Sequence, residues 1–475
     1  MSNQSNVARN AVWLVAQPVL VGVVSIVVTA LVARDLGAAD YGTLLLLLSY
    51  TALFTQISNL GLRPYSVREI AADSSRTAEI VSEMIVLRSA LAGIAILVAA
   101  LLLALIDPAL PVPLAVALFV LILLNALTGC FIDGLQGGEH MKAVATSFAI
   151  SGVLVQVSSL ASIALHLGVT GIAAAYVLGA IAMLTLVWSR FHLLAGKVDA
   201  RYFGKPRILH LRLSWVFLLQ NIVGTIRARI DLVIINAMFG AHAAGIYGSA
   251  MVLIQRLDQI QDGIATALFS RVAYLNARFP DELKTLVRGA VKVILVISTP
   301  MAVGLLAVSN DVVALMFGNQ YGESGPILAI LGLGVPFMFV SGVMFNVLRA
   351  MSVEAVVLKA SLCTTLLMIF FFIAGIYLLG LAGAAWAYVL GVATLATLLL
   401  LEYRRIAGAP WSGADLVKIV AANAAMAGVL WLIRDQAMVM KVIAAIVVYA
   451  TVVRVLGLVT VGMIKTMFVS RKSTS

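Results

Sequence analysis

Long stretches without a charged residue recur along the whole chain, and they constrain its fold more than any other feature. Examples are Val19–Leu31, Ile94–Ile106 and Leu114–Leu124. The chain is 62% hydrophobic and only 11% charged, whereas a soluble domain carries about a quarter charged residues. A soluble fold of 475 residues could not hide this much apolar surface from water. The sequence therefore predicts an all-α polytopic membrane protein.

Spanning helices need about twenty mostly apolar residues each, and this criterion gives about fourteen of them. Their approximate ranges are 11–33, 41–62, 84–106, 112–134, 146–166, 169–190, 213–238, 245–268, 290–310, 326–350, 358–379, 381–403, 415–433 and 439–463. Tight turns expected at Gly168 and Gly380 divide two closely spaced pairs. The polar residues 1–9 lead into the first segment without a small-residue cleavage pattern, so we expect no cleaved signal peptide.

The placement of the basic residues orients these helices. The chain has 32 Lys and Arg residues and a formal net charge of +11. If the N-terminus is cytoplasmic, nearly all of them fall at cytoplasmic loops, including Arg63, Arg68, Arg76 and Arg88. The exceptions are Arg34, Arg434 and Lys441 in outer loops and Arg227, Arg229, Arg256 and Arg454 within the membrane. We therefore expect both termini in the cytoplasm, and a basic charge that reflects orientation and attraction to membrane lipids rather than nucleic-acid binding.

The chain also repeats itself. Residues 167–179 match residues 379–391 at an offset of 212, and the segment around Gly37 resembles that around Gly240. Six expected helices lie in each half, so both halves start on the same side of the membrane and form a parallel repeat. The expected regions are an N-lobe (1–194), a cytoplasmic inter-lobe linker (195–212), a C-lobe (213–403) and two additional helices with a cytoplasmic tail (404–475).

Several short motifs resemble one group of bacterial transporters. They are NAVWL from Asn10, ARDLGAADYG from Ala33, NLGLRPYSVREI from Asn59, IDLVI from Ile230 and GIYG from Gly245. In these motifs, and in length and duplication, the chain resembles the O-antigen/exopolysaccharide flippases of the multidrug/oligosaccharidyl-lipid/polysaccharide (MOP) exporter superfamily. The resemblance implies two lobes in a V-shaped arrangement that alternate access. In the lipid II flippase, a sibling branch, the two extra C-terminal helices form a groove for the lipid tail.

The resemblance also implies a function. The expected activity is translocation of a lipid-linked (undecaprenyl-diphosphate) oligosaccharide from the inner to the outer leaflet of the bacterial cytoplasmic (inner) membrane, for O-antigen or other surface polysaccharide. Alternatives are a cation-coupled multidrug (MATE-type) antiporter, a lipid II flippase and a membrane-embedded polysaccharide polymerase or ligase. Proton-coupled antiporters carry an acidic residue in the first helix, and residues 11–33 have none. Expected partners are polyprenyl-diphosphate-linked oligosaccharide and membrane lipids, and further candidates are the glycosyltransferases and polymerase of the same pathway.

Charged side chains within the bilayer are costly, so they mark candidate sites. They are Arg227, Arg229, Asp231, Arg256, Asp258 and Asp262. Neutral polar groups at comparable places in the first half are Gln17, Gln56 and Asn59. In one interpretation the arginines and neutral groups line a central cavity and bind the diphosphate of the lipid carrier. The aspartates then tune the arginines or take up H⁺ or Na⁺ to drive the cycle. In the other, three arginines and three aspartates pair and lock two helices together.

Basic residues at cytoplasmic helix ends carry less information. Arg63, Arg68 and Arg271 could close an inner gate, but snorkelling towards the membrane surface is the preferred interpretation. No phosphate-binding loop, H-E-x-x-H pattern or catalytic-triad context is present. We therefore expect no enzyme activity, no catalytic residues, no cofactor and no metal site.

Overall fold

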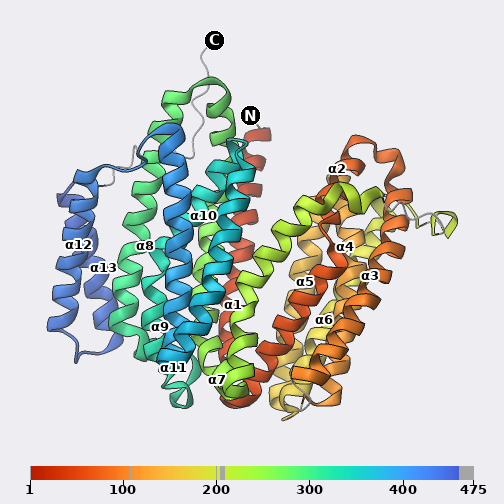
Figure 1. Ribbon diagram of the computed structural model, residues 1–475, viewed down its shortest axis with the longest axis horizontal. Helices are drawn as coiled ribbons and strands as arrows, with labels where there is room; N and C mark the ends of the chain where they lie inside the picture. The colour runs from red at the N-terminus through yellow and green to blue at the C-terminus, as the bar shows by residue number, and fades with distance from the viewer. Residues whose placement is uncertain (1, 107–109, 199, 204–208, 459–475) are drawn as a thin grey trace. The chain divides into compact units, whose positions relative to one another are not determined.

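The computed structural model describes residues 2–106, 110–198, 200–203 and 209–458 (Figure 1). Within these ranges the regular elements are helices. The α-helices are α1 (Ser2–Asn59), α2 (Leu62–Ala72), α3 (Thr77–Ile106), α4 (Val112–Gly137), α5 (Met141–Ala164), α6 (Gly168–Leu194), α7 (Leu209–Arg278), α8 (Pro280–Phe317), α9 (Ser324–Leu333), α10 (Val335–Ala350), α11 (Glu354–Ala407), α12 (Gly413–Leu432) and α13 (Met438–Val455). Short 3₁₀ turns are η1 (Ser74–Arg76), η2 (Ala200–Tyr202) and η3 (Asn319–Tyr321).

The all-α, many-crossing fold expected from the sequence is confirmed, but the number of continuous helices is lower than fourteen. Among the described residues, ten helices are long and apolar enough to cross a membrane, or eleven if the bent pair α9 and α10 forms one span. The difference arises because three pairs of expected segments follow one another across a kink, without an intervening loop, and share one label. These helices are α1, α7 and α11, with 58, 70 and 54 residues.

Each joined helix is broken at a glycine. The backbone leaves helical geometry at Gly37 (φ 73°, ψ 172°), Gly240 (φ 80°, ψ 177°) and Gly380 (φ 59°, ψ −137°). Positive φ angles of this kind strain residues that carry a β-carbon, so glycine is the residue that fits. Gly168, which matches Gly380 in sequence, has a φ of 60°. The corresponding glycines of the two sequence repeats therefore have similar positive φ angles.

The first turns of α1 and α7 after these breaks pack directly against each other. A β-carbon on Gly42 would lie 1.9 Å from the carbonyl oxygen of Ala241, and one on Gly245 would lie 1.8 Å from that of Ala38. Both helices have an Ala-x-x-x-Gly pattern here, and such pairs of small residues let helix backbones touch in membranes. The contact is reciprocal, because each glycine meets the alanine of the other helix.

The described chain forms two compact units, unit 1 (Met1–Gly245) and unit 2 (Ile246–Ser475). The boundary lies within α7, so the first part of this helix belongs to unit 1 and the second part to unit 2. The inter-lobe linker expected at 195–212 stays a prediction, and residues 199 and 204–208 of it lie outside the described residues.

Unit 1 has an apolar core centred on α4. The buried members are Leu62, Ile70, Ile80, Val81, Met84, Cys130, Phe131, Ile132, Leu135, Val144, Met183, Val187 and Phe191. Two glycines of α4 let neighbouring helices come close. A β-carbon on Gly134 would lie 2.6 Å from the ring of Phe191 in α6, and one on Gly137 would lie 2.6 Å from Ile70 in α2. This dense packing excludes water from the apolar core around α4.

In unit 2, α12 and α13 lie side by side against α8 (Figure 1). Their shared core includes Val296, Ile419, Ala422, Met426, Leu430, Tyr449 and Leu458. Ion pairs flank this core: Lys292 Nζ lies 2.9 Å from Asp415 Oδ1, and Lys441 Nζ lies 2.5 Å from Asp311 Oδ2. Lys292 and Asp311 are about 28 Å apart along α8 at 1.5 Å per residue, close to the thickness of a bilayer core of about 30 Å. Polar contacts thus hold α12 and α13 at two points of α8 that are about one bilayer core apart.

Removing one of these polar contacts tests how much they contribute to the attachment of α12 and α13 to α8. We expect Asp311→Ala to destabilise the attachment of α13 by about 1–3 kcal/mol, because the buried ammonium of Lys441 loses its partner. Backbone amides of α13 should exchange hydrogen faster than in the wild type. Arg434→Ala is the control, because its pair with Asp435 is exposed and contributes little. Unchanged exchange in α13 of Asp311→Ala would show that the apolar core alone holds the helix.

Candidate functional site

The candidate residues from the sequence are divided between the two units. In unit 1 they are Gln56 and Asn59 on α1 and Arg227, Arg229 and Asp231 on the first part of α7. Asp231 is buried, and its Oδ1 accepts a hydrogen bond from the N–H of Leu232 at 2.8 Å. The other four side chains are half-buried. The side chain of Gln17 lies outside the described part of the structure.

In unit 2 the candidate residues lie on the second part of α7. They are Arg256, Asp258 and Asp262. Arg256 donates a hydrogen bond from Nη1 to Oε1 of Gln259 at 3.4 Å, and Asp262 is exposed. The buried residue of this stretch is Gln261, which packs against Gly342 of α10. The helix thus turns Gln261, rather than the carboxylate of Asp262, into the interior of unit 2. The binding and coupling roles of the candidate residues stay predictions.

Unit 1 contains an apolar cavity of about 380 Å³ between α1, α3 and α7. Its lining residues are Tyr50, Leu53, Phe54, Gln56, Ile57, Leu102, Leu103, Thr225, Ile226, Ile230 and Val233. Ligand pockets in proteins are typically about 300–1,000 Å³ and mostly apolar. Because this lining offers few hydrogen-bonding groups, it suits a hydrocarbon chain better than a sugar. Gln56 is one of those few groups.

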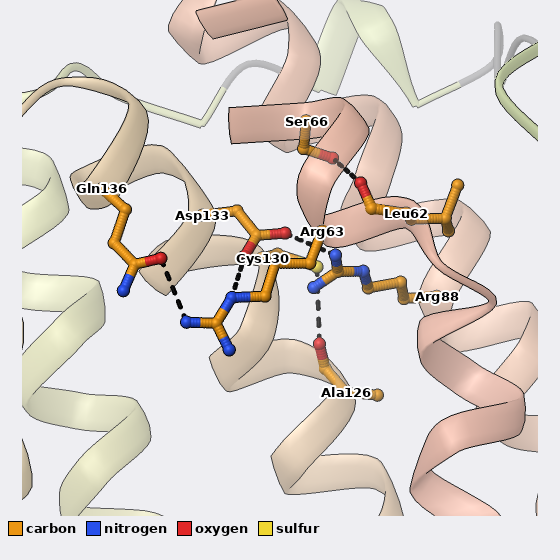
Figure 2. A network of polar contacts seen from close by, with 8 residues as sticks. All are labelled: Leu62, Arg63, Ser66, Arg88, Ala126, Cys130, Asp133 and Gln136. Carbon is orange, nitrogen blue, oxygen red and sulfur yellow. Dashed lines mark hydrogen bonds and ion pairs between the residues drawn. The ribbon is translucent and has the colours of Figure 1, made fainter. Parts of the chain in front are cut away.

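A buried ion pair joins α3 to α4 in the same unit (Figure 2). Arg88 donates a hydrogen bond from Nη2 to Oδ2 of Asp133, and the two side chains are 1% and 2% exposed. A buried charge is tolerated when an opposite charge and hydrogen bonds compensate its lost hydration. The pairing is incomplete in hydrogen-bonding terms, because Nε of Arg88 and Oδ1 of Asp133 have no hydrogen-bond partner among the described residues.

Arg63, the second residue of α2, brings another guanidinium group to this pair. Its Nε lies 3.7 Å from Oδ1 of Asp133, and its Nη2 donates a hydrogen bond to Oε1 of Gln136 at 3.0 Å. Gln136 lies three residues after Asp133 on α4, so the two acceptors are neighbours on that helix. The side chain of Arg63 is 57% exposed. Two positive charges therefore share one carboxylate, which leaves the described network with a net charge of +1.

Asn59, predicted as a site residue, lies beside this network. A β-carbon on Gly129 of α4 would lie 2.6 Å from Nη1 of Arg88 and 3.6 Å from Oδ1 of Asn59. Gly129 thus leaves the space that the Arg88 guanidinium fills. On α1, Gln56 and Asn59 are three residues apart, or about 4.5 Å along a helix. The apolar cavity and the charged network are therefore close neighbours along α1.

Sequence reasoning did not find this network. It placed Arg88 among the basic residues of cytoplasmic loops, whereas the structure buries Arg88 within α3. It gave Asp133 no role, although a lone carboxylate in the apolar segment 112–134 is a signal that a partner is required. The identity of the partner depends on which helices touch, because Arg88 and Asp133 are 45 positions apart.

Comparison with known proteins places this site in a family. Residues 7–274, more than half of the chain, match the model of a family described as polysaccharide biosynthesis protein. The chain belongs to the polysaccharide biosynthesis protein family. The segment matched by this family contains the cavity, the Arg88–Asp133 pair and every candidate residue from the sequence, whereas α8–α13 follow it.

A curated relative is the teichuronic acid biosynthesis protein TuaB of Bacillus subtilis (strain 168). It is 25% identical over 118 residues, which are 24% of this chain and 24% of TuaB. The alignment therefore spans about a quarter of that relative.

Solved structures show which fold this polysaccharide biosynthesis protein has. The lipid II flippase MurJ in an inward closed conformation has a TM-score of 0.73 and 15% identity, over 93% of this chain and 97% of that chain. An inward-facing MATE family multidrug resistance transporter of the MOP superfamily has a TM-score of 0.63 and 16% identity, over 81% and 94%. Likeness at such low identity shows the fold. The protein is a multi-pass integral membrane protein with the fold of these MOP superfamily structures.

Proposed function

We propose that the protein is a flippase for an undecaprenyl-diphosphate-linked oligosaccharide, which it carries from the inner to the outer leaflet of the bacterial inner membrane for surface polysaccharide synthesis. The observation that carries this proposal is the family match over residues 7–274, which connects the chain to polysaccharide biosynthesis. The MOP fold supports movement across a membrane as its part in that process. The substrate class is then a glycan on a lipid carrier, because the sugars are assembled on such carriers before export.

We further propose fourteen membrane crossings in two parallel six-helix repeats with two additional helices. The broken helices α1, α7 and α11 each supply two crossings, and α9 with α10 supplies one. The shared backbone geometry at Gly37 and Gly240 supports a common origin of the two halves. The distribution of Lys and Arg along the sequence supports cytoplasmic termini.

In the proposed cycle, alternating access exposes a polar site first to the cytoplasm and then to the outer surface. Arg227, Arg229 and Arg256 receive the diphosphate, since guanidinium groups match phosphate oxygens in geometry and charge. Asp231 and Asp258 hold these arginines in place or exchange a cation during the cycle. The apolar cavity of unit 1 accommodates part of a hydrocarbon chain. Other proteins of the pathway, including glycosyltransferases and a polymerase, supply and consume the lipid-linked glycan.

Two other transport functions have support from the fold. MurJ is described as a lipid II flippase, and the MATE family protein as a multidrug resistance transporter. Both share this fold at 15–16% identity, so either substrate class is compatible with the backbone. The family match favours polysaccharide synthesis, and a functional assay separates the three.

The test is complementation of a bacterial strain that lacks its own O-antigen flippase. We expect the wild type to restore surface polysaccharide, and Arg227→Ala, Arg229→Ala and Asp231→Asn to reduce it about tenfold or more, because each removes a charge-assisted contact worth about 1.5–3 kcal/mol. Arg404→Ala, at an exposed position near the end of α11, is the control. Membrane abundance of each variant is measured by immunoblot.

The outcomes discriminate between the functions. Restored drug resistance without surface polysaccharide would favour the antiporter, and rescue of a strain lacking the lipid II flippase would favour that substrate. Full activity of all three variants would reject the assignment of Arg227, Arg229 and Asp231 to the transport site.

A further inference from the structure

Pro300 lies inside α8, and it leaves one main-chain carbonyl group without its usual partner. In an α-helix each N–H donates to the carbonyl group four residues earlier, so the residue at position 300 would donate to Val296. Proline has no N–H, and its ring crowds that carbonyl group. Val296 is buried, and a buried carbonyl group without a hydrogen bond is costly, above all in a membrane. A donor from outside the helix is therefore required.

A tyrosine of α13 supplies this donor. The hydroxyl group of Tyr449 donates a hydrogen bond to the carbonyl oxygen of Val296 at 2.9 Å. Tyr449 is 8% exposed and belongs to the core that α8, α12 and α13 share. Because the side chain is buried, water competes little for this hydrogen bond. The tyrosine therefore replaces the main-chain hydrogen bond that Pro300 cannot make.

A polar side chain of α12 reaches the same turn of α8. Thr299, the residue before Pro300, donates a hydrogen bond from Oγ1 to the carbonyl oxygen of Leu295 at 2.7 Å. The same Oγ1 accepts a hydrogen bond from Nδ2 of Asn423 at 2.8 Å. Two consecutive carbonyl groups of α8 thus receive side-chain hydrogen bonds at the proline turn. Both α12 and α13 take part in this polar contact.

Ion pairs attach the same two helices to α8 on either side of Pro300. Lys292 lies about 12 Å before Pro300 along the helix, at 1.5 Å per residue, and pairs with Asp415 of α12. Asp311 lies about 16 Å after Pro300 and pairs with Lys441 of α13. Prolines are sites at which long helices bend. Because α12 and α13 contact α8 before, at and after its proline, these contacts oppose a change of the bend.

We propose that α12 and α13 keep α8 rigid across Pro300, and that Tyr449 is the positioning residue that satisfies the carbonyl group left free at Val296. Without these contacts, the proline turn would be a hinge within unit 2. With them, α8 behaves as one rigid element, so a displacement of one end moves the other end with it. This role concerns the shape of α8, and it holds whichever substrate the protein carries.

A double-mutant cycle tests the proposal with the full chain in phosphatidylcholine nanodiscs, by hydrogen–deuterium exchange of peptides that cover α8. Tyr449→Phe removes the hydroxyl group and keeps the ring, so amides of α8 near Pro300 should exchange about tenfold faster. Pro300→Ala restores an N–H that can donate to Val296. In the Pro300→Ala background, Tyr449→Phe should therefore change the exchange by less than about twofold. Peptides of α4, in unit 1, are the internal reference and should not change.

Spin labels on either side of the proline measure the shape of α8 itself. Lys284→Cys and Leu315→Cys place labels at exposed positions, in a Cys363→Ser background because Cys363 is also exposed. The two labelled positions are about 45 Å apart along the helix, and pulsed electron paramagnetic resonance measures the distribution of their distances. We expect a narrow distribution with Tyr449 intact, a broader one with Tyr449→Phe, and a narrow one again when Pro300→Ala is added.

Tyr403→Phe is the matched control. Tyr403 is 1% exposed, and its hydroxyl group has no hydrogen-bond partner among the described residues. Its loss should leave the exchange of α8 and the distance distribution unchanged. The proposal is overturned if Tyr403→Phe and Tyr449→Phe speed exchange equally, since the effect would then be that of any buried hydroxyl group. It is also overturned if Tyr449→Phe has no effect, or the same effect with and without Pro300.

Discussion

Asp133→Ala should reduce the free energy of unfolding by about 3–5 kcal/mol, the usual effect of removing one partner of a buried ion pair. Arg88 would keep its charge in an apolar core with no counter-ion, and Arg63 would lose the carboxylate that faces its Nε. A domain with a typical stability of about 5–15 kcal/mol loses a large fraction of it in this way. We expect a lower denaturant midpoint for the purified protein and reduced abundance in the membrane.

A double variant separates the cost of the unpaired charge from the value of the pair. In Arg88→Met with Asp133→Leu, both charged groups are replaced by apolar side chains of similar size, which is often neutral or stabilising. We therefore expect the double variant to be more stable than Asp133→Ala, and close to the wild type. If the double variant were as unstable as Asp133→Ala, the loss of stability would come from the lost attraction between Arg88 and Asp133. It would not come from the cost of leaving Arg88 charged and buried without a partner.

Gly42→Ala and Gly245→Ala should each destabilise the protein by at least about 1–3 kcal/mol, the usual range for overpacking. The added β-carbons would lie 1.9 Å and 1.8 Å from carbonyl oxygens of the facing helix, so the backbones of α1 and α7 would have to move apart. A flexible side chain could turn aside, but a backbone carbonyl within a helix cannot. Thermal unfolding and the complementation assay both report the effect, and we expect surface polysaccharide to fall with stability.

Gly93→Ala is the control, because a β-carbon on Gly93 would meet nothing within 4 Å. Alanine is a better helix former than glycine by about 1 kcal/mol, so this variant should be equal to or more stable than the wild type. The double variant Gly42→Ala with Gly245→Ala should lose less than the sum of the single variants, since one separation of the helices relieves both overlaps. Additive losses would show that the two contacts are independent.

Much of the fold follows from local features of the sequence. Apolar segments of spanning length predict the helices, and the repeated glycines near positions 37 and 240 fall where α1 and α7 break. The expected turns at Gly168 and Gly380 are also present. Both glycines have positive φ, with α6 beginning at the first and the two parts of α11 meeting at a kink at the second.

The charged network shows where sequence reasoning ends. Position relative to the expected helix ends makes Arg63 and Arg88 look alike, as cytoplasmic basic residues. The structure buries one and exposes the other, because Gly129 of α4 leaves space for the guanidinium group of Arg88. Asp133 is the residue that connects them, and its partners lie 45 and 70 positions away in the sequence. Contacts of this range depend on which helices pack together, and helical periodicity does not contain that information.

The meeting of Gly42 with Ala241 and of Gly245 with Ala38 limits which residues each helix can carry at this point. At most helix contacts a larger side chain on one helix can be offset by a smaller one on the other. Here the facing group is a main-chain carbonyl, which no substitution on the other helix can remove. A loss of glycine at these two positions therefore cannot be compensated by a change elsewhere in the pair.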